Sequence, residues 1–284
     1  MKIGVYTGRL SRWGEKRYQM LRSLGYSCVD FNMANTNISP YDLDEIQFAE
    51  TLLQERQLAE QAGIEINQVH GPWRWPPEDF APENRMERME KMQRSIRAAS
   101  LLGAKNWVVH PLMPFGIEDI DSGNEQDTWD INVEFMQRLL ITAKEYDVTI
   151  CLENMPMPKF SIGSVSDVLR FVKTMNDSHF KICLDTGHVA VFPGESPSNA
   201  LRELGSEVRA LHIHDNDGKS DLHKIPYDGI IDWEDFAQAL QEVGYQGVFS
   251  YETAPSGAVS LEDAESIYLQ MIETANCILA FHRT

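Results

Sequence analysis

Short apolar runs alternate with amphipathic stretches along the whole chain. Runs rich in Val, Ile and aromatic residues predict strands, and several of the amphipathic stretches end at a glycine, the usual stop signal of a helix. The predicted strands are Lys2–Thr7, Ser27–Asn32, Ile64–His70, Asn106–His110, Val148–Glu153, Phe180–Asp185, Val208–His214 and Gly247–Glu252. The predicted helices are Glu15–Leu24, Leu43–Ala62, Pro82–Leu102, Trp129–Tyr146, Ser166–Met175, Ser198–Leu204, Trp233–Val243 and Leu261–Phe281.

Strict alternation of strands and helices, without a linker-like segment, predicts an α/β protein made of a single (β/α)8 TIM barrel spanning 1–284. The main alternative is a doubly wound open sheet. No G-x-G-x-x-G follows the first strand, which argues against a dinucleotide-binding sheet of that kind.

Six of the predicted strands end in a residue of a type that binds metals. In a (β/α)8 barrel the C-terminal strand ends form one face, where active sites lie, so these side chains are expected to meet there. Small side chains two residues earlier, at Cys151, Cys183, Ala210 and Ser250, should point the same way and leave room above them. The strand-end residues are His70, His110, Glu153, Asp185, His212 and Glu252.

Converging carboxylates need a cation, because an unpaired buried carboxylate is costly. No lysine or arginine stands at these strand ends, so a divalent metal is the simplest partner for Glu153, Asp185 and Glu252. Asp221 and His223 form a D-x-H pair that could hold an ion. Six of the eight histidines fall on the same predicted rim: His70, His110, His188, His212, His214 and His223.

Three long connections should cover this face: Gly71–Ala81, Pro111–Asp127 and Asn154–Gly163. The first has the aromatic and proline-rich sequence G-P-W-R-W-P-P. The predicted substrate-binding residues are His188, His214, Trp73, Arg74, Trp75 and Lys159.

Composition limits the binding partners and the cellular location that we expect for the protein. The net charge of −18 disfavours nucleic acid as a partner, since contacts with phosphates need clustered Lys and Arg. No apolar run is long enough for a transmembrane helix, and the N-terminus lacks a signal peptide, so a cytoplasmic protein is expected. The four cysteines form no C-x-x-C pair and are expected to be reduced and mostly buried. Homo-oligomerisation stays open.

Four motifs resemble the xylose isomerase-like superfamily, the group of sugar phosphate isomerases and epimerases and endonuclease IV. They are E-N at 153–154, L-D-T-G-H at 184–188, H-I-H-D-N at 212–216 and Y-E-T at 251–253. The resemblance implies a metal-dependent isomerase or epimerase of a sugar, polyol or sugar phosphate, with an enediolate stabilised by zinc or manganese, or by magnesium or cobalt. It implies metal ligands at Glu153, Asp185, His212 and Glu252, and proton transfer by Glu153 and Glu252.

The endonuclease IV branch implies a larger set of zinc ligands, and every position of that set is also filled here. A multi-zinc phosphodiester hydrolase is therefore the alternative function, and a silent sugar-binding barrel is a third. A second ion is expected at the His70/His110 or the His188/Asp221/His223 group. Residues 215–219 lack the paired arginines of ketohexose 3-epimerases, so the resemblance does not name the sugar.

Overall fold

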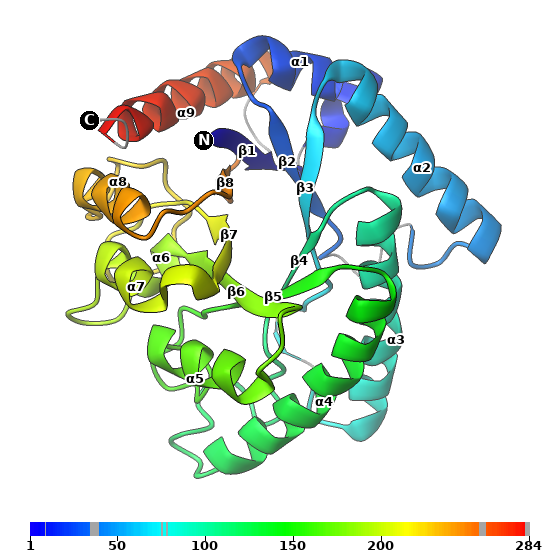
Figure 1. Ribbon diagram of the computed structural model, residues 1–284, viewed down its shortest axis with the longest axis vertical. Coiled ribbons are helices and arrows are strands. Elements are labelled where there is room, and N and C mark those ends of the chain that lie inside the picture. Colours follow the sequence, from blue (N-terminus) through cyan, green and yellow to red (C-terminus); the bar gives the residue numbers. More distant parts are fainter. Residues whose placement is uncertain (9, 35–39, 75, 78, 256–259, 282–284) are drawn as a thin grey trace.

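The computed structural model describes residues 1–8, 10–34, 40–74, 76–77, 79–255 and 260–281. Eight parallel strands form one sheet in the order β7-β6-β5-β4-β3-β2-β1-β8, and helices surround it as an outer ring (Figure 1). The predicted single (β/α)8 barrel is confirmed.

The strands match their predicted positions to within one or two residues at each end. They are β1 Lys2–Tyr6, β2 Cys28–Asn32, β3 Glu65–His70, β4 Asn106–Val109, β5 Thr149–Glu153, β6 Phe180–Asp185, β7 Val208–His212 and β8 Val248–Tyr251. The α-helices are α1 Arg17–Leu24, α2 Glu45–Ala62, α3 Pro82–Leu101, α4 Glu125–Glu145, α5 Val165–Met175, α6 Thr186–Ala190, α7 Pro197–Leu204, α8 Trp233–Glu242 and α9 Leu261–Phe281. Two 3-10 helices, η1 Leu10–Lys16 and η2 Gly205–Glu207, complete the set among the described residues.

The barrel closes just beyond the end of β7. Ile213 forms a parallel bridge with Tyr251, donating its N–H to the Ser250 carbonyl at 2.9 Å and accepting from the Glu252 N–H at 3.2 Å. The prediction of strand through His214 was therefore too long, because β7 ends at His212 and only Ile213 continues the pairing. This closure holds the residues after β7 and β8 next to each other.

The interior of the barrel below its C-terminal face is filled by small side chains. Val108, Cys151, Cys183 and Ala210 form one buried cluster inside the sheet, and Ser250 is also buried. The prediction that Cys151, Cys183 and Ala210 point into the barrel is confirmed. Small groups at this level leave space for imidazoles and carboxylates one step higher along each strand.

The surrounding helices are placed by local sequence signals and by their apolar faces. In α5, Ser164 and Asp167 form a capping box, and Asn176 ends the helix in the left-handed region at φ 46°. Val168 and Phe171 of this helix are buried against the sheet.

Within the part of the chain that the structure describes, no helix is both long and apolar enough to cross a membrane.

Candidate active site

The C-terminal ends of β5 to β8 bring together the four residues that the motifs implied as metal ligands: Glu153, Asp185, His212 and Glu252. Each offers one ligand atom, and these atoms all lie within 4.8 Å of one another. His212 Nδ1 is 2.9 Å from Glu153 Oε1 and 3.5 Å from Glu252 Oε2. Glu153, Asp185 and His212 are fully buried, and the Glu252 side chain is 12% exposed. The opening therefore lies on the Glu252 side.

Protein donors do not satisfy all the carboxylate oxygens of this group. Glu252 Oε2 is buried and has no hydrogen-bond partner, and Glu153 Oε2 lies 3.0 Å from His110 Nε2. A buried carboxylate oxygen without a donor is costly, whereas a bound cation would satisfy the Glu252 oxygen and offset the charge of Glu153. Three carboxylates and one imidazole form an oxygen-rich donor set that Mn²⁺, Mg²⁺, Co²⁺ or Zn²⁺ can use. The residues present fit a divalent metal ion.

The two glutamates differ in their electrostatic surroundings. Burial would raise the pKa of the Glu153 carboxyl, but the His212 and His110 imidazoles outweigh it and hold this pKa well below the ordinary value. Burial raises the pKa of Glu252, and His212 only partly opposes it while Glu153 adds to the increase. Neighbouring carboxyl groups with opposed shifts are characteristic of acid–base sites.

Asp30 is a site residue that sequence reasoning missed. It lies on β2, fully buried, and its Oδ2 accepts from His212 Nε2 and from Gln68 Nε2, both at 2.9 Å. Because Nε2 donates to Asp30, His212 presents Nδ1 to Glu153 and Glu252. The available signal was a charged residue inside the apolar run C-V-D-F, where strand alternation directs Asp30 to the side opposite Val29 and Phe31.

His70 and His110 lie beside the same carboxylates, as predicted. His70 donates its Nδ1–H to the Gly71 carbonyl at 2.9 Å and places Nε2 3.6 Å from Glu153 Oε2. His110 Nε2 is 3.0 Å from the same oxygen, and burial lowers the pKa of His110 to about 4. A neutral imidazole in this position can act as a metal ligand or as a hydrogen-bond partner.

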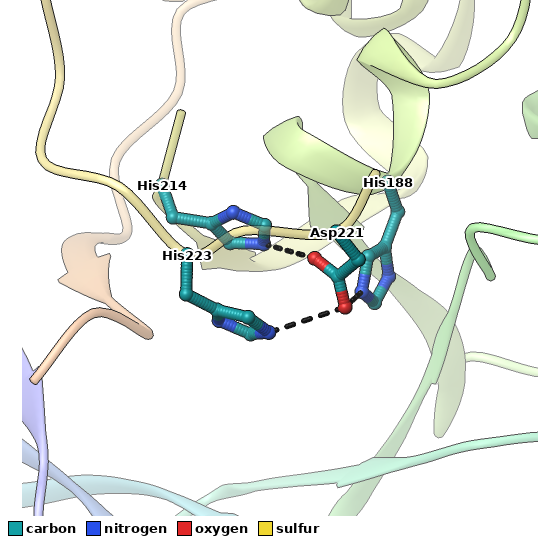
Figure 2. A group of neighbouring side chains, drawn as sticks. All are labelled: His188, His214, Asp221 and His223. Atoms are coloured by element: carbon teal, nitrogen blue, oxygen red, sulfur yellow. Dashed lines mark hydrogen bonds and ion pairs between the residues drawn. The ribbon is translucent and has the colours of Figure 1, made fainter. Parts of the chain in front are cut away.

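A second group lies on the other side of Asp185. His188, His214, Asp221 and His223 also bring one ligand atom each to within 4.8 Å of the others (Figure 2). His214 Nε2 is 3.0 Å from the Asp185 carboxylate, which therefore faces both groups. We call this second set the histidine-rich group.

The connection from β7 to α8 carries three members of the histidine-rich group and is organised by Asp215. This buried carboxylate accepts from four backbone N–H groups and from one indole N–H, at 2.9–3.2 Å; the donors are Asn216, Tyr227, Ile230, Ile231 and Trp233 Nε1. Five donors on one side chain hold the irregular segment in a single shape. The sequence contained H-I-H-D-N but no sign of which aspartate would be buried.

The covering loops are cross-linked by polar contacts. Asp119 is buried and accepts from the Ser161 N–H at 2.9 Å, which joins two of the three predicted covering loops. Trp73 packs edge-on against the His110 ring at 4.8 Å. Arg74 pairs with Glu87 at 2.9 Å. Lys159, which is exposed, pairs with Asp121 at 2.5 Å.

These contacts place only Trp73 directly against a histidine of the site. Substrate contacts by Arg74 and Lys159 stay predictions, since both already hold acidic partners. Trp75, also predicted to bind substrate, lies outside the described residues.

Comparison with known proteins agrees with this geometry. The family model described as xylose isomerase-like TIM barrel matches residues 18–272. The D-psicose 3-epimerase of Enterocloster bolteae is 23% identical over 262 residues, covering 87% of this chain and 80% of the relative.

Two solved structures share the fold over nearly the whole chain. A D-tagatose 3-epimerase-like protein superposes with a TM-score of 0.78 at 23% identity, covering 100% of both chains. The IolI protein with a bound zinc atom also has a TM-score of 0.78, at 17% identity and 99% coverage of both chains. Since the family model spans most of the sequence, this chain belongs to the family of xylose isomerase-like TIM barrel proteins.

Proposed function

We propose that the protein is a divalent-metal-dependent isomerase or epimerase acting on a sugar, polyol or sugar phosphate. The observation that carries the proposal is the convergence of Glu153, Asp185, His212 and Glu252 within 4.8 Å. Glu252 contributes one buried oxygen that lacks a hydrogen-bond partner. The similarity to a D-psicose 3-epimerase supports a sugar as the substrate.

In this proposal the two glutamates perform the proton transfer. Glu153 extends from the end of β5 and Glu252 follows β8, so they approach the site from different parts of the barrel wall. One carboxylate removes the carbon-bound proton from one side of the substrate, and the other returns a proton from the opposite side. When bound, the divalent ion supplies the positive charge that holds adjacent substrate oxygens and stabilises a developing enediolate.

Other side chains would orient the sugar. Trp73, packed on His110, offers an apolar ring surface, and the imidazoles of His70 and His110 offer hydrogen bonds to hydroxyl groups. Arg74, Trp75 and Lys159 remain proposed substrate contacts from the covering loops.

The proposal is tested by exchange of substrate hydrogen with deuterated solvent, across a panel of ketoses and their phosphates. Glu153→Gln and Glu252→Gln should each abolish both exchange and turnover, because each removes one proton-transferring group. Glu60→Gln is the matched control, since Glu60 is an exposed carboxylate of α2 paired with Arg56. If both active-site variants still isomerised the substrate, the proposed mechanism would be wrong.

A multi-zinc phosphodiester hydrolase of the endonuclease IV type is the second candidate. Its support is that His70, His110 and the histidine-rich group all gather around the same carboxylates. The net charge of −18 speaks against DNA as the substrate. Incision of DNA with an abasic site at ordinary salt, without isomerisation of any ketose, would replace the first proposal by this one.

A further inference from the structure

One guanidinium group contacts the covering loop 71–81 at two places. Arg88 lies on α3 with a side chain that is only 5% exposed. Its Nη2 donates to the Pro72 carbonyl at 3.2 Å, and its Nη1 donates to the Asp79 carboxylate at 3.0 Å. Trp73 is the first residue of the segment that lies between these two contacts in the sequence. We call Arg88 with its contacts to Pro72 and Asp79 the Arg88 bridge.

Asp79 joins the Arg88 bridge to the next connection of the barrel. Its Oδ2 accepts the Met113 N–H at 3.1 Å, and Met113 belongs to the loop that follows His110. The preceding residue, Leu112, is held by α4. The Asn132 Oδ1 accepts the Leu112 N–H at 2.7 Å, and the Asn132 Nδ2 donates to the Leu112 carbonyl at 2.9 Å. The backbone just after His110 is therefore fixed to the same network as the covering loop.

The side chain that this network supports at the site is Trp73. Its ring packs edge-on against the His110 imidazole, with centroids 4.8 Å apart and an interplanar angle of 66°. Its N–H donates to the Ala34 carbonyl at 3.1 Å, which holds the backbone. His110 Nε2 in turn lies 3.0 Å from Glu153 Oε2. A continuous series of contacts therefore leads from Arg88 through the Trp73 ring to the carboxylates.

The chemistry of the Arg88 bridge indicates positioning more than stabilisation. Burying an ion pair costs desolvation, and a well-packed apolar pair of similar volume often stabilises a fold equally well. Charge-assisted hydrogen bonds are directional, so they also fix the relative position of the groups that they join. A planar guanidinium can donate to a carbonyl and to a carboxylate at the same time, whereas a lysine ammonium is a single point charge on a flexible stem.

We propose that Arg88 is a positioning residue for substrate binding, which sets the place of the Trp73 ring at the site. Arg88 is buried and acts through the backbone of Pro72 and the carboxylate of Asp79. The proposal rests on the proposed function, in which Trp73 offers its ring to the sugar. Such a ring surface binds the ground state and the transition state alike, so displacing it should change KM more than kcat.

The kinetic test uses Arg88→Lys, measured first with D-psicose and then with the other ketoses of the panel. Lysine keeps a positive charge beside Asp79 but cannot also reach the Pro72 carbonyl. KM should rise about tenfold, as for the loss of one charge-assisted hydrogen bond, while kcat stays nearly unchanged. The control is Arg17→Lys, which changes another partly buried arginine, paired with Glu55 of α2, and should leave both constants unchanged. An equal fall of kcat and kcat/KM would overturn the proposal.

A double-mutant cycle shows whether Arg88 acts through Trp73. Trp73→Ala removes the ring and should raise KM by itself. If the ring transmits the effect of Arg88, adding Arg88→Lys to Trp73→Ala should raise KM no further, because the effects of coupled residues are not additive. Increases in KM that multiply as for two independent sites would overturn the proposal.

Amide hydrogen exchange separates this proposal from the proposed function, because it needs no substrate. The N–H groups of Trp73 and Met113 are both hydrogen-bonded. Peptides that carry these two amides should exchange faster in Arg88→Lys than in the wild type and in Arg17→Lys, as mass spectrometry can show. Unchanged exchange in both peptides would overturn the proposal. Faster exchange in a protein that isomerises no ketose would support the role of the Arg88 bridge and refute only the function.

Discussion

Replacing Asp30 by Asn should weaken metal binding at the carboxylate centre without moving His212. This centre is the set formed by Glu153, Asp185, His212 and Glu252. Asp30 Oδ2 accepts from His212 Nε2 and Gln68 Nε2, both at 2.9 Å, and Asp30 Oδ1 has no partner. An asparagine can therefore place its oxygen where Oδ2 now lies and keep both hydrogen bonds. The substitution removes only the negative charge behind the imidazole, which makes His212 a weaker donor to the metal.

The size of the effect follows from the hydrogen bond that changes. A buried charge-assisted bond contributes about 1.5–3 kcal/mol and a neutral one about 0.5–1.5 kcal/mol, so Asp30→Asn should lose about 1–1.5 kcal/mol. That loss corresponds to about a tenfold weaker metal affinity. Asp30→Leu also removes the acceptor, and should approach the loss of about 100-fold seen for missing outer partners of metal ligands.

Isothermal titration of the metal-free protein with Mn²⁺ measures the effect, since Mn²⁺ prefers the oxygen-rich centre. The control is Asp119→Asn, which removes the charge of another buried aspartate, one that accepts from Ser161. It should bind Mn²⁺ as the wild type does. Equal Mn²⁺ affinity in wild type, Asp30→Asn and Asp30→Leu would refute the role of Asp30, as would equal weakening in the control.

Three further outcomes are expected. Gly187→Ala should lower the melting temperature, because the 1.9 Å approach of the added Cβ to His214 outweighs the gain of about 1 kcal/mol in helix propensity; an unchanged melting temperature would contradict the steric argument. Arg88→Met should lower the free energy of unfolding, measured in urea, by about 3–5 kcal/mol. It leaves the buried Asp79 carboxylate, whose Oδ1 lies 3.0 Å from Arg88 Nη1, without its cation; a decrease below about 1 kcal/mol would contradict this. Alkylation of the native protein at pH 8 should modify Cys277, the exposed thiol, while the three buried thiols react only after unfolding, as mass spectrometry can show.

The convergence of the strand-end residues could be predicted because a barrel imposes a period on the sequence. Once strands end at Glu153, Asp185 and His212, the fold alone brings these side chains to one face. Asp30 could not be placed in the same way, because it sits within β2 rather than at the end of a strand. Its partner, His212, is 182 residues away along the chain.

The short helix α6 was missed for a local reason. Thr186 and Gly187 are poor helix formers, so no helix was predicted there. The helix forms because the Asp185 carboxylate caps it, accepting from the His188 N–H at 2.7 Å. A local cap thus outweighs low helix propensity here.

Asp185 also links the two centres thermodynamically. One of its oxygens caps α6, while the carboxylate faces His214 at 3.0 Å and His212 at 4.0 Å. A cation on either side withdraws charge from the same carboxylate, so occupation of one centre changes the affinity of the other. Such coupling is reciprocal: the factor by which a cation at the histidine-rich group would alter cation binding at Glu153 and Glu252 equals the factor for the reverse effect. The charge held by the histidine-rich group would therefore tune the neighbouring carboxylates without touching the substrate.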